Sequence, residues 1–374
     1  ALLIFLCANT DLKYKGKMKE IKSKIRIKDI AVLAGVSEGT VDRVLHQRGD
    51  VSAKSLEAVN KVLEEIKYTP NLMARSLASK KQYRFVCLFP AHQSADYWQS
   101  INDGFNLAAE EFLHHNVQIE KRYFNQFDAQ SFVDISVEIL ETKPDAVFIA
   151  PIFRNETLQF TSKLVELQIP FSYIDSMIEE TDFVTYYGQH SFQSGYIAAK
   201  LLLHSGCANN KILIIRTQRK GAMSNQTLNR NSGFMQYIND NGLADKLELI
   251  NVEFKDDDEM ANLEVLREVF ATHTTIKAAI TFNSKAYRLA MHLETLNKLD
   301  VQLIGYDLLE QNVDYLKKDM IAYLIAQRPE KQAYCTVRDM CKELIFKQEV
   351  SSINYVPIDI LMKENIDYYS RFRE

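Results

Sequence analysis

The sequence predicts a small all-α head joined to a larger α/β body made of two doubly wound parallel sheets. Three observations lead to this fold class. Apolar residues recur at helical spacing near the N-terminus, short apolar strands alternate with amphipathic helices in the remainder, and the two parts differ in the sign of their charge. With 374 residues, 47% of them hydrophobic, the chain is long enough for two or three domains.

The charged side chains are unevenly distributed. Residues 1–84 carry 17 lysines and arginines against 9 acidic residues, whereas the remainder carries 28 against 40. A basic N-terminal part favours contact with a polyanion. The five cysteines are scattered and never have the two-residue spacing of zinc ribbons or redox motifs, which favours a reducing compartment. No apolar run reaches the length of a membrane span, and residues 1–25 are interpreted as a disordered extension.

Three short helices are expected to make up the head. From Ile27 onward the apolar side chains fall on one helical face, which is interrupted once, at Gly35. Gly35 supplies the backbone angles of a tight turn, and Ser37 is placed to cap the helix that follows. The third helix begins after Ser52 and stops before Pro70.

Residues 27–81 read IKDIAVLAGVSEGTVDRVLHQRGDVSAKSLEAVNKVLEEIKYTPNLMARSLASKK, which resembles the headpiece of the lac repressor (LacI/GalR) family. The AGVS turn, the TV.RVL helix, the VS cap, the Y.PN connector and the A..L hinge occur in the same order. The resemblance implies a helix-turn-helix head over residues 26–70, and a hinge helix with a linker over residues 71–82.

In such heads the second helix lies in the major groove of double-stranded operator DNA with its N-terminal residues at base edges. Arg43 is the foremost candidate, because a guanidinium pairs bidentately with guanine. Glu38 either accepts a hydrogen bond from cytosine or complements the helix dipole. Asp42 departs from the small hydroxyl residue common in the family; it either reads the DNA or pairs with Arg43 or Arg48.

The hinge supplies further candidates through the resemblance. Leu77 stands where the family inserts a leucine wedge into the minor groove, although an ordinary packing role is the alternative. Ala74 lies on the same face one turn earlier. The candidate DNA-binding residues are Ser37, Glu38, Gly39, Thr40, Arg43, Asn71, Ala74 and Leu77.

Ten short apolar runs after Lys81 alternate with helices, too many for one small sheet. They are expected to form two lobes, and the body resembles the sensor of the same family, which is similar to periplasmic binding proteins of the ribose-binding type. Three crossings between the lobes follow from that resemblance. The first lobe is expected to comprise residues 83–186 and 328–348, and the second residues 187–327 and 349–374.

A ligand cleft is expected outside the carboxyl ends of the strands. Polar and aromatic side chains at those ends suit the hydroxyls or the ring face of a sugar. Arg230 and Gln327 match ligand-binding positions of the family, and Trp98 either stacks on the ligand or packs between elements. For the polar residues a surface or capping role is the alternative. The candidate ligand-binding residues are Tyr97, Trp98, Asp175, Arg230, Asn283, Asp307 and Gln327.

The interpretation is a cytoplasmic homodimeric repressor whose binding to operator DNA is controlled by a small polar effector, with no cofactor, no metal and no membrane partner. Two other classes compete with it. A solute-binding transport protein would use the same body but has no use for a DNA head, and an enzyme would need an acid/base or cofactor motif that the sequence lacks. The acidic residues 256–259 are interpreted as a helix cap rather than a metal site.

Overall fold

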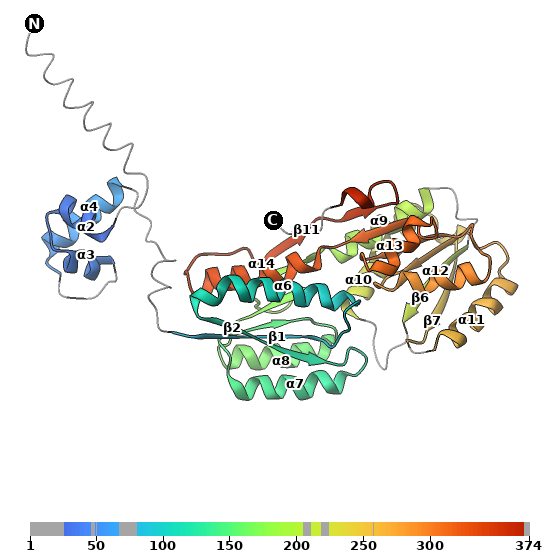
Figure 1. The fold of residues 1–374 in the computed structure, drawn as a ribbon, viewed down its shortest axis with the longest axis horizontal. Coiled ribbons are helices and arrows are strands. Elements are labelled where there is room, and N and C mark those ends of the chain that lie inside the picture. The colour runs from blue at the N-terminus through green and yellow to red at the C-terminus, as the bar shows by residue number, and fades with distance from the viewer. Residues whose placement is uncertain are drawn as a thin grey trace, which may run out of the picture. The chain divides into compact units, whose positions relative to one another are not determined.

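The computed structural model describes residues 26–45, 49, 51–66, 81–204, 211–217, 224–256 and 258–369. Two compact units divide the chain, one within residues 1–74 and the other within residues 75–374. Figure 1 shows the elements of both units. The extension expected at residues 1–25 and the hinge helix lie outside the described residues. Among the helices described, none is long and apolar enough to cross a membrane.

The head contains three helices around a small apolar core. Gly35 ends the first helix in the left-handed conformation, at φ 64°, and Ser37 accepts a hydrogen bond from the backbone of Thr40 at 3.1 Å, as the sequence predicts. Ser52 likewise caps the third helix through the amide of Ser55. The helices are α2 (Ile27–Ala34), α3 (Glu38–Leu45) and α4 (Ala53–Glu65), and their buried contacts are Ile30, Ala31, Val41 and Val59.

The first sheet of the body has six parallel strands in the order β11–β5–β4–β3–β1–β2. Its central strands are largely apolar and buried because helices cover both faces, α6 and α14 on one and α7 and α8 on the other (Figure 1). The bounds are β1 (Tyr83–Pro90), α6 (Tyr97–Phe112), β2 (Val117–Phe124), α7 (Ala129–Thr142), β3 (Ala146–Ile149), α8 (Arg154–Glu166), β4 (Phe171–Asp175), β5 (Tyr186–Gln189), α14 (Pro329–Leu344) and β11 (Ile353–Val356).

The second sheet repeats this plan in the order β12–β10–β9–β8–β6–β7, with β12 as an antiparallel edge. Helices α9 and α10 pack on one face, and α11, α12 and α13 cover the other. The bounds are α9 (Ser191–His204), β6 (Lys211–Thr217), α10 (Asn225–Asp240), β7 (Glu248–Phe254), α11 (Glu259–Thr272), β8 (Ala278–Thr281), α12 (Ala286–Thr295), β9 (Gln302–Tyr306), α13 (Glu310–Lys317), β10 (Tyr323–Ala326) and β12 (Asp359–Leu361).

The chain crosses between the lobes after β5, after β10 and after β11. As expected, α14 returns to the first lobe, where it packs against α6, and the final strand joins the second lobe. Two expected boundaries differ from the structure. The expected boundary at 186/187 falls inside β5. It was placed too early because the polar end of that strand looks like a connection. The segment from residue 349, expected in the second lobe, supplies β11 to the first sheet. The half-exposed pattern of β11 gave no apolar signal.

Close backbone contact between α9 and α10 yields a stability prediction. A Cβ added at Gly195 would lie 1.8 Å from the carbonyl oxygen of Arg230, so Gly195→Ala is expected to destabilise the body by about 2 kcal/mol or more. At the exposed helical Gly39 an added Cβ would make only an ordinary van der Waals contact, 3.9 Å from Oγ of Ser37, so Gly39→Ala is expected to stabilise the head by about 0.5–1 kcal/mol.

Denaturant unfolding checks both values, because the fluorescence of Trp98 reports on the body and the ellipticity on the whole chain. An unchanged fluorescence midpoint for Gly195→Ala would contradict the contact.

Candidate ligand site and DNA-binding head

Two aspartates occupy equivalent places in the two sheets. Asp175 is the last residue of β4, and Asp307 directly follows β9. Both have a φ of 68° and both are nearly inaccessible, with exposed fractions of 3% and 4%. A left-handed backbone costs a residue other than glycine about 1 kcal/mol or more, and such strain gathers at binding sites. The repeated geometry therefore makes the carboxyl ends of both sheets the candidate site.

A chain of hydrogen bonds joins these two carboxylates. The hydroxyl of Tyr97 donates to Oδ1 of Asp175 at 2.7 Å, and Nε2 of Gln226 donates to the same oxygen at 2.8 Å. Nε2 of Gln226 also lies 3.1 Å from Oε1 of Gln327, whose own Nε2 donates to Asp307 at 2.9 Å. Residues from α6 and β4 of the first lobe thus contact residues from α10, β9 and the second crossing.

Arg230 lies on α10 one turn after Gln226 and is completely buried. Its guanidinium stacks over the ring of Tyr306 at 3.8 Å, and Nη1 donates to the carbonyl of Phe282 at 2.8 Å. Nε and Nη2 have no hydrogen-bond partner among the described residues. Because an unpaired buried donor costs about 1–3 kcal/mol, these two groups are suited to an acceptor from a ligand.

Burial sets the protonation of the site. It raises the pKa of Asp307 to about 7, against the opposing effects of the Arg230 charge and the hydrogen bond from Gln327. Burial also raises the pKa of Tyr97 well above its usual range, helped by the charges of Asp175 and Asp307. Tyr97 is therefore a hydrogen-bond donor at neutral pH, and burial favours the protonated form of Asp307 more than that of an exposed aspartate.

We call Tyr97, Asp175, Gln226, Arg230, Asp307 and Gln327 the interlobe cluster. The structure brings five of the seven expected ligand residues into it. Trp98 is nearby but buried, with its ring packed edge-on against Tyr97 at 5.1 Å. Asn283 stands apart, because its Nδ2 donates to Thr217 and its Oδ1 accepts from the backbone of Lys285.

Two glutamines escaped the sequence reasoning. Gln226 carried one usable signal, its position four residues before Arg230 on the same helix face. Gln332 accepts from the backbone of Asp175 at 3.2 Å and donates to the carbonyl of Gln327 at 2.7 Å, so it holds two cluster residues in place. Nothing in its local sequence distinguishes it from an ordinary helical glutamine.

In the head, the expected DNA-reading residues lie at the start of α3 and along its exposed side. Ser37, Glu38, Gly39 and Arg43 are exposed, whereas Val41 turns into the core. Ser37 and Thr40 also bond to each other through their hydroxyls at 2.9 Å. The remaining candidates, Asn71, Ala74 and Leu77, lie outside the described residues.

A capped acidic loop follows β7. Asp258 accepts from the backbone of Ala261 and so caps α11, as expected. Asp256 and Glu259 pair with Arg288, at 3.0 and 2.5 Å. The described residues contain no group of three or more His, Cys, Asp or Glu side chains that could hold a metal ion.

A three-helix head and a two-lobed body with a polar cluster between its sheets define a ligand-controlled transcription regulator. Residues 26–71 match the model of the bacterial regulatory proteins of the lacI family, and residues 86–348 match that of the periplasmic binding protein domain. The chain belongs to the LacI family of transcriptional regulators and is not an enzyme. The match over the head also weighs against a transport protein.

Similar proteins agree with this assignment. The crystal structure of a protein assigned as a LacI transcriptional regulator from Bacteroides fragilis is 38% identical, has a TM-score of 0.74, and covers 78% of this chain and 100% of its own. The transcriptional regulator MalR of Streptococcus pneumoniae is 24% identical over 76% of this chain and 83% of its own length. The ribose operon repressor of Lactococcus lactis is 26% identical over 75% of this chain and 80% of its own length.

The raised pKa of Asp307 predicts a pH effect on stability. The folded protein holds a proton on this carboxyl that the unfolded chain releases near pH 4, so stability falls as the pH rises from about 4 to about 7. Asp307→Asn removes this dependence. The melting temperature of the variant relative to the wild type should therefore increase over that range and level off above it.

Asp314→Asn, an exposed substitution of the same kind, serves as the control in thermal melts at each pH. A constant difference between Asp307→Asn and the wild type from pH 4 to pH 8 would refute the assignment.

Proposed function

We propose that a sugar or sugar derivative binds at the interlobe cluster and controls the affinity of the head for operator DNA. The observation that carries this proposal is the combination of two unpaired N–H groups on buried Arg230 with two buried carboxylates. A hydroxyl both donates and accepts, so a polyhydroxylated ligand matches donors and acceptors that stand side by side. The similarity to a ribose operon repressor supports the same ligand class.

Each cluster residue has a role in this proposal. Arg230 donates to ring or hydroxyl oxygens, while Asp175 and Asp307 accept from hydroxyls, each from its own lobe. Tyr97 and Gln327 orient the two carboxylates through the bonds described above. Trp98 and Asn283 remain proposed wall residues, Trp98 by supporting Tyr97 or by stacking on the sugar ring.

Control of DNA binding follows from where Gln226 lies. Its amide bonds Asp175 across the lobes, and Asn225 beside it donates to the carbonyl of Met177 at 2.8 Å. A ligand that takes over the bonds of Asp175 changes the relation of the lobes. We infer a coupling free energy of about 1–3 kcal/mol between this site and the operator.

For the head, we propose that α3 reads base edges through Ser37, Glu38, Thr40 and Arg43, with Gly39 allowing close approach to the DNA. Asn71, Ala74 and Leu77 are proposed to act in the hinge. Two heads of a homodimer would bind two half-sites, because one small head buries little surface and paired heads multiply affinity. We propose the cytoplasm as the site of action, since that is where operator DNA is found.

Effector binding is tested by a thermal-shift screen of monosaccharides and their phosphates. A sugar that binds should raise the melting temperature in proportion to the logarithm of its concentration. Asp175→Asn and Arg230→Lys should each weaken binding of that sugar at least tenfold. Asp175→Asn removes an acceptor, and Arg230→Lys misplaces the paired donors. Exposed Asp134→Asn is the matched control. Undiminished affinity in both cluster variants would reject the site.

DNA reading is tested by selecting operator sequences from a random library. Arg43→Ala should relax the preference at one base position of each half-site, which corresponds to about 1–3 kcal/mol of lost discrimination. Lys54→Ala, on the exposed side of α4, should leave the selected sequence unchanged. Identical preferences for Arg43→Ala and the wild type would show that Arg43 does not read a base.

A further inference from the structure

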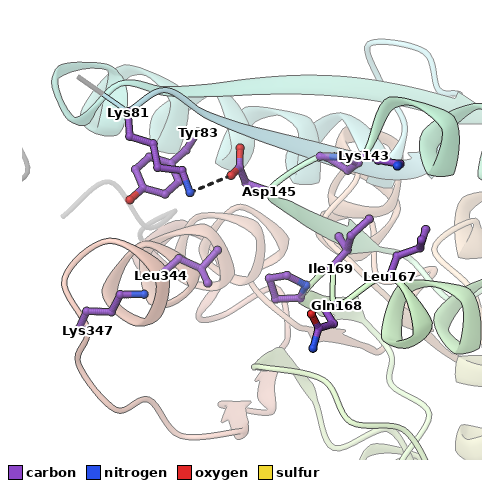
Figure 2. A pocket seen from close by; sticks show the side chains of 11 residues that line it. Lys81, Tyr83, Lys143, Asp145, Leu167, Gln168, Ile169, Leu344 and Lys347 are labelled. Carbon is purple, nitrogen blue, oxygen red and sulfur yellow. Dashed lines mark ion pairs between the residues drawn. The ribbon is translucent and has the colours of Figure 1, made fainter. Parts of the chain in front are cut away.

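A cavity of about 430 Å³ opens at the edge of the first sheet opposite the interlobe cluster (Figure 2). Tyr83, which begins β1, Asp145, which precedes β3, and Pro170, which precedes β4, all line it. Asp175 ends β4, so the length of that strand, about 13 Å, separates the two places. The cavity is therefore independent of the proposed effector site.

Polar and apolar groups both line this cavity, and its rim is basic. Pro144, Ile169 and Leu344 contribute apolar surface from the ends of three different elements. The volume lies within the range of pockets that hold small molecules, about 300–1,000 Å³. A ligand suited to such walls has an apolar body.

Three lysines and one aspartate make up the charged groups of the lining. Asp145 is already matched, since it pairs with Lys81 at 3.1 Å and accepts from the backbone of Arg84 at 2.9 Å. Lys143 and Lys347 make no ion pair with any carboxylate in the described part of the chain. The charge left over at the rim is positive and favours an anion.

The backbone around the cavity is unusual for lysine. Lys143 and Lys347 have φ angles of 46° and 53°, and Gln168, also in the lining, has 55°. Glycine or asparagine adopts this left-handed conformation at lower cost where a helix ends. A lysine anywhere in the last helical turn would complement the helix dipole without that cost.

We propose that this cavity is a second small-molecule site, which takes an organic anion with an apolar body, such as an aromatic carboxylate or sulfonate. The anionic group lies at the basic rim, where Lys143 and Lys347 supply the unmatched charge, and the apolar body fills the space between Ile169 and Leu344. The first described residue after the head and hinge, Lys81, is part of the same wall. An anion bound here contacts the lobe where the chain enters it.

The experiment uses the full chain and two fluorescent probes of the same shape. 8-Anilinonaphthalene-1-sulfonate is anionic, and N-phenyl-1-naphthylamine is its uncharged counterpart. Lys143→Glu and Lys347→Glu should each weaken binding of the anionic probe about fivefold or more. The affinity for the neutral probe should stay within twofold of the wild-type value. Lys200→Glu, an exposed reversal on α9 of the other lobe, is the matched control and should change neither.

Two further measurements keep the outcomes distinct. Leu344→Trp fills the cavity and should abolish binding of both probes. Asp175→Asn, in the interlobe cluster, should change the binding of neither. Equal weakening of the anionic probe by Lys143→Glu and Lys200→Glu would overturn the proposal, because net charge alone would explain the binding. Loss of the probe in Asp175→Asn would place it at the effector site instead, and would leave the proposed function standing.

Discussion

The two hydrogen bonds that Gln226 makes with Asp175 and Gln327 are the contact on which the arrangement of the body depends. They connect one lobe to the other and to the crossing between them through a single amide group. Bonds of this kind contribute about 0.5–1.5 kcal/mol each, which is small compared with the packing of either lobe. These bonds are therefore weak enough for a ligand that competes for them to shift the relation of the lobes.

Side chains also tie the three crossings to one another. Nε2 of Gln189, at the first crossing, donates to the carbonyl of Ala326 at the second, at 2.9 Å. Arg328 lies at the second crossing and pairs at 2.7 Å with Asp359, which lies beside the third crossing. The hydroxyl of Tyr369 donates to the same carboxylate. Side chains therefore couple the three connections, and we expect the relation of the lobes to change by hinge bending rather than by independent loop motion.

The sequence predicted most of the fold and part of the site, for different physical reasons. Short apolar runs identified the inner strands β1, β3 to β6 and β8 to β10, because buried strands must be apolar on both faces. Strand ends then located Asp175 and Asp307. The edge strands β11 and β12 are half exposed and mixed in composition, so the same rule could not place them or reveal that β12 is antiparallel.

Individual contacts were harder to predict than positions. Asn283 follows a strand just as Asp307 does, yet its amide is used within its own turn. Gln226 came into the cluster through tertiary contact with the other lobe, which no local pattern encodes. The cavity at the amino ends of the strands was missed for the same reason, since its walls come from segments up to 266 residues apart.

The features that make the interlobe cluster useful also make it costly. Nε and Nη2 of Arg230 are buried without a partner among the described residues, and Asp307 is held where its charge is disfavoured. Each is a free-energy cost that a hydroxyl could relieve. A ligand bound as proposed would gain affinity from a cost already present, and only in the lobe arrangement that presents all these groups together. In that proposal, affinity and conformational selectivity arise from the same buried polar atoms.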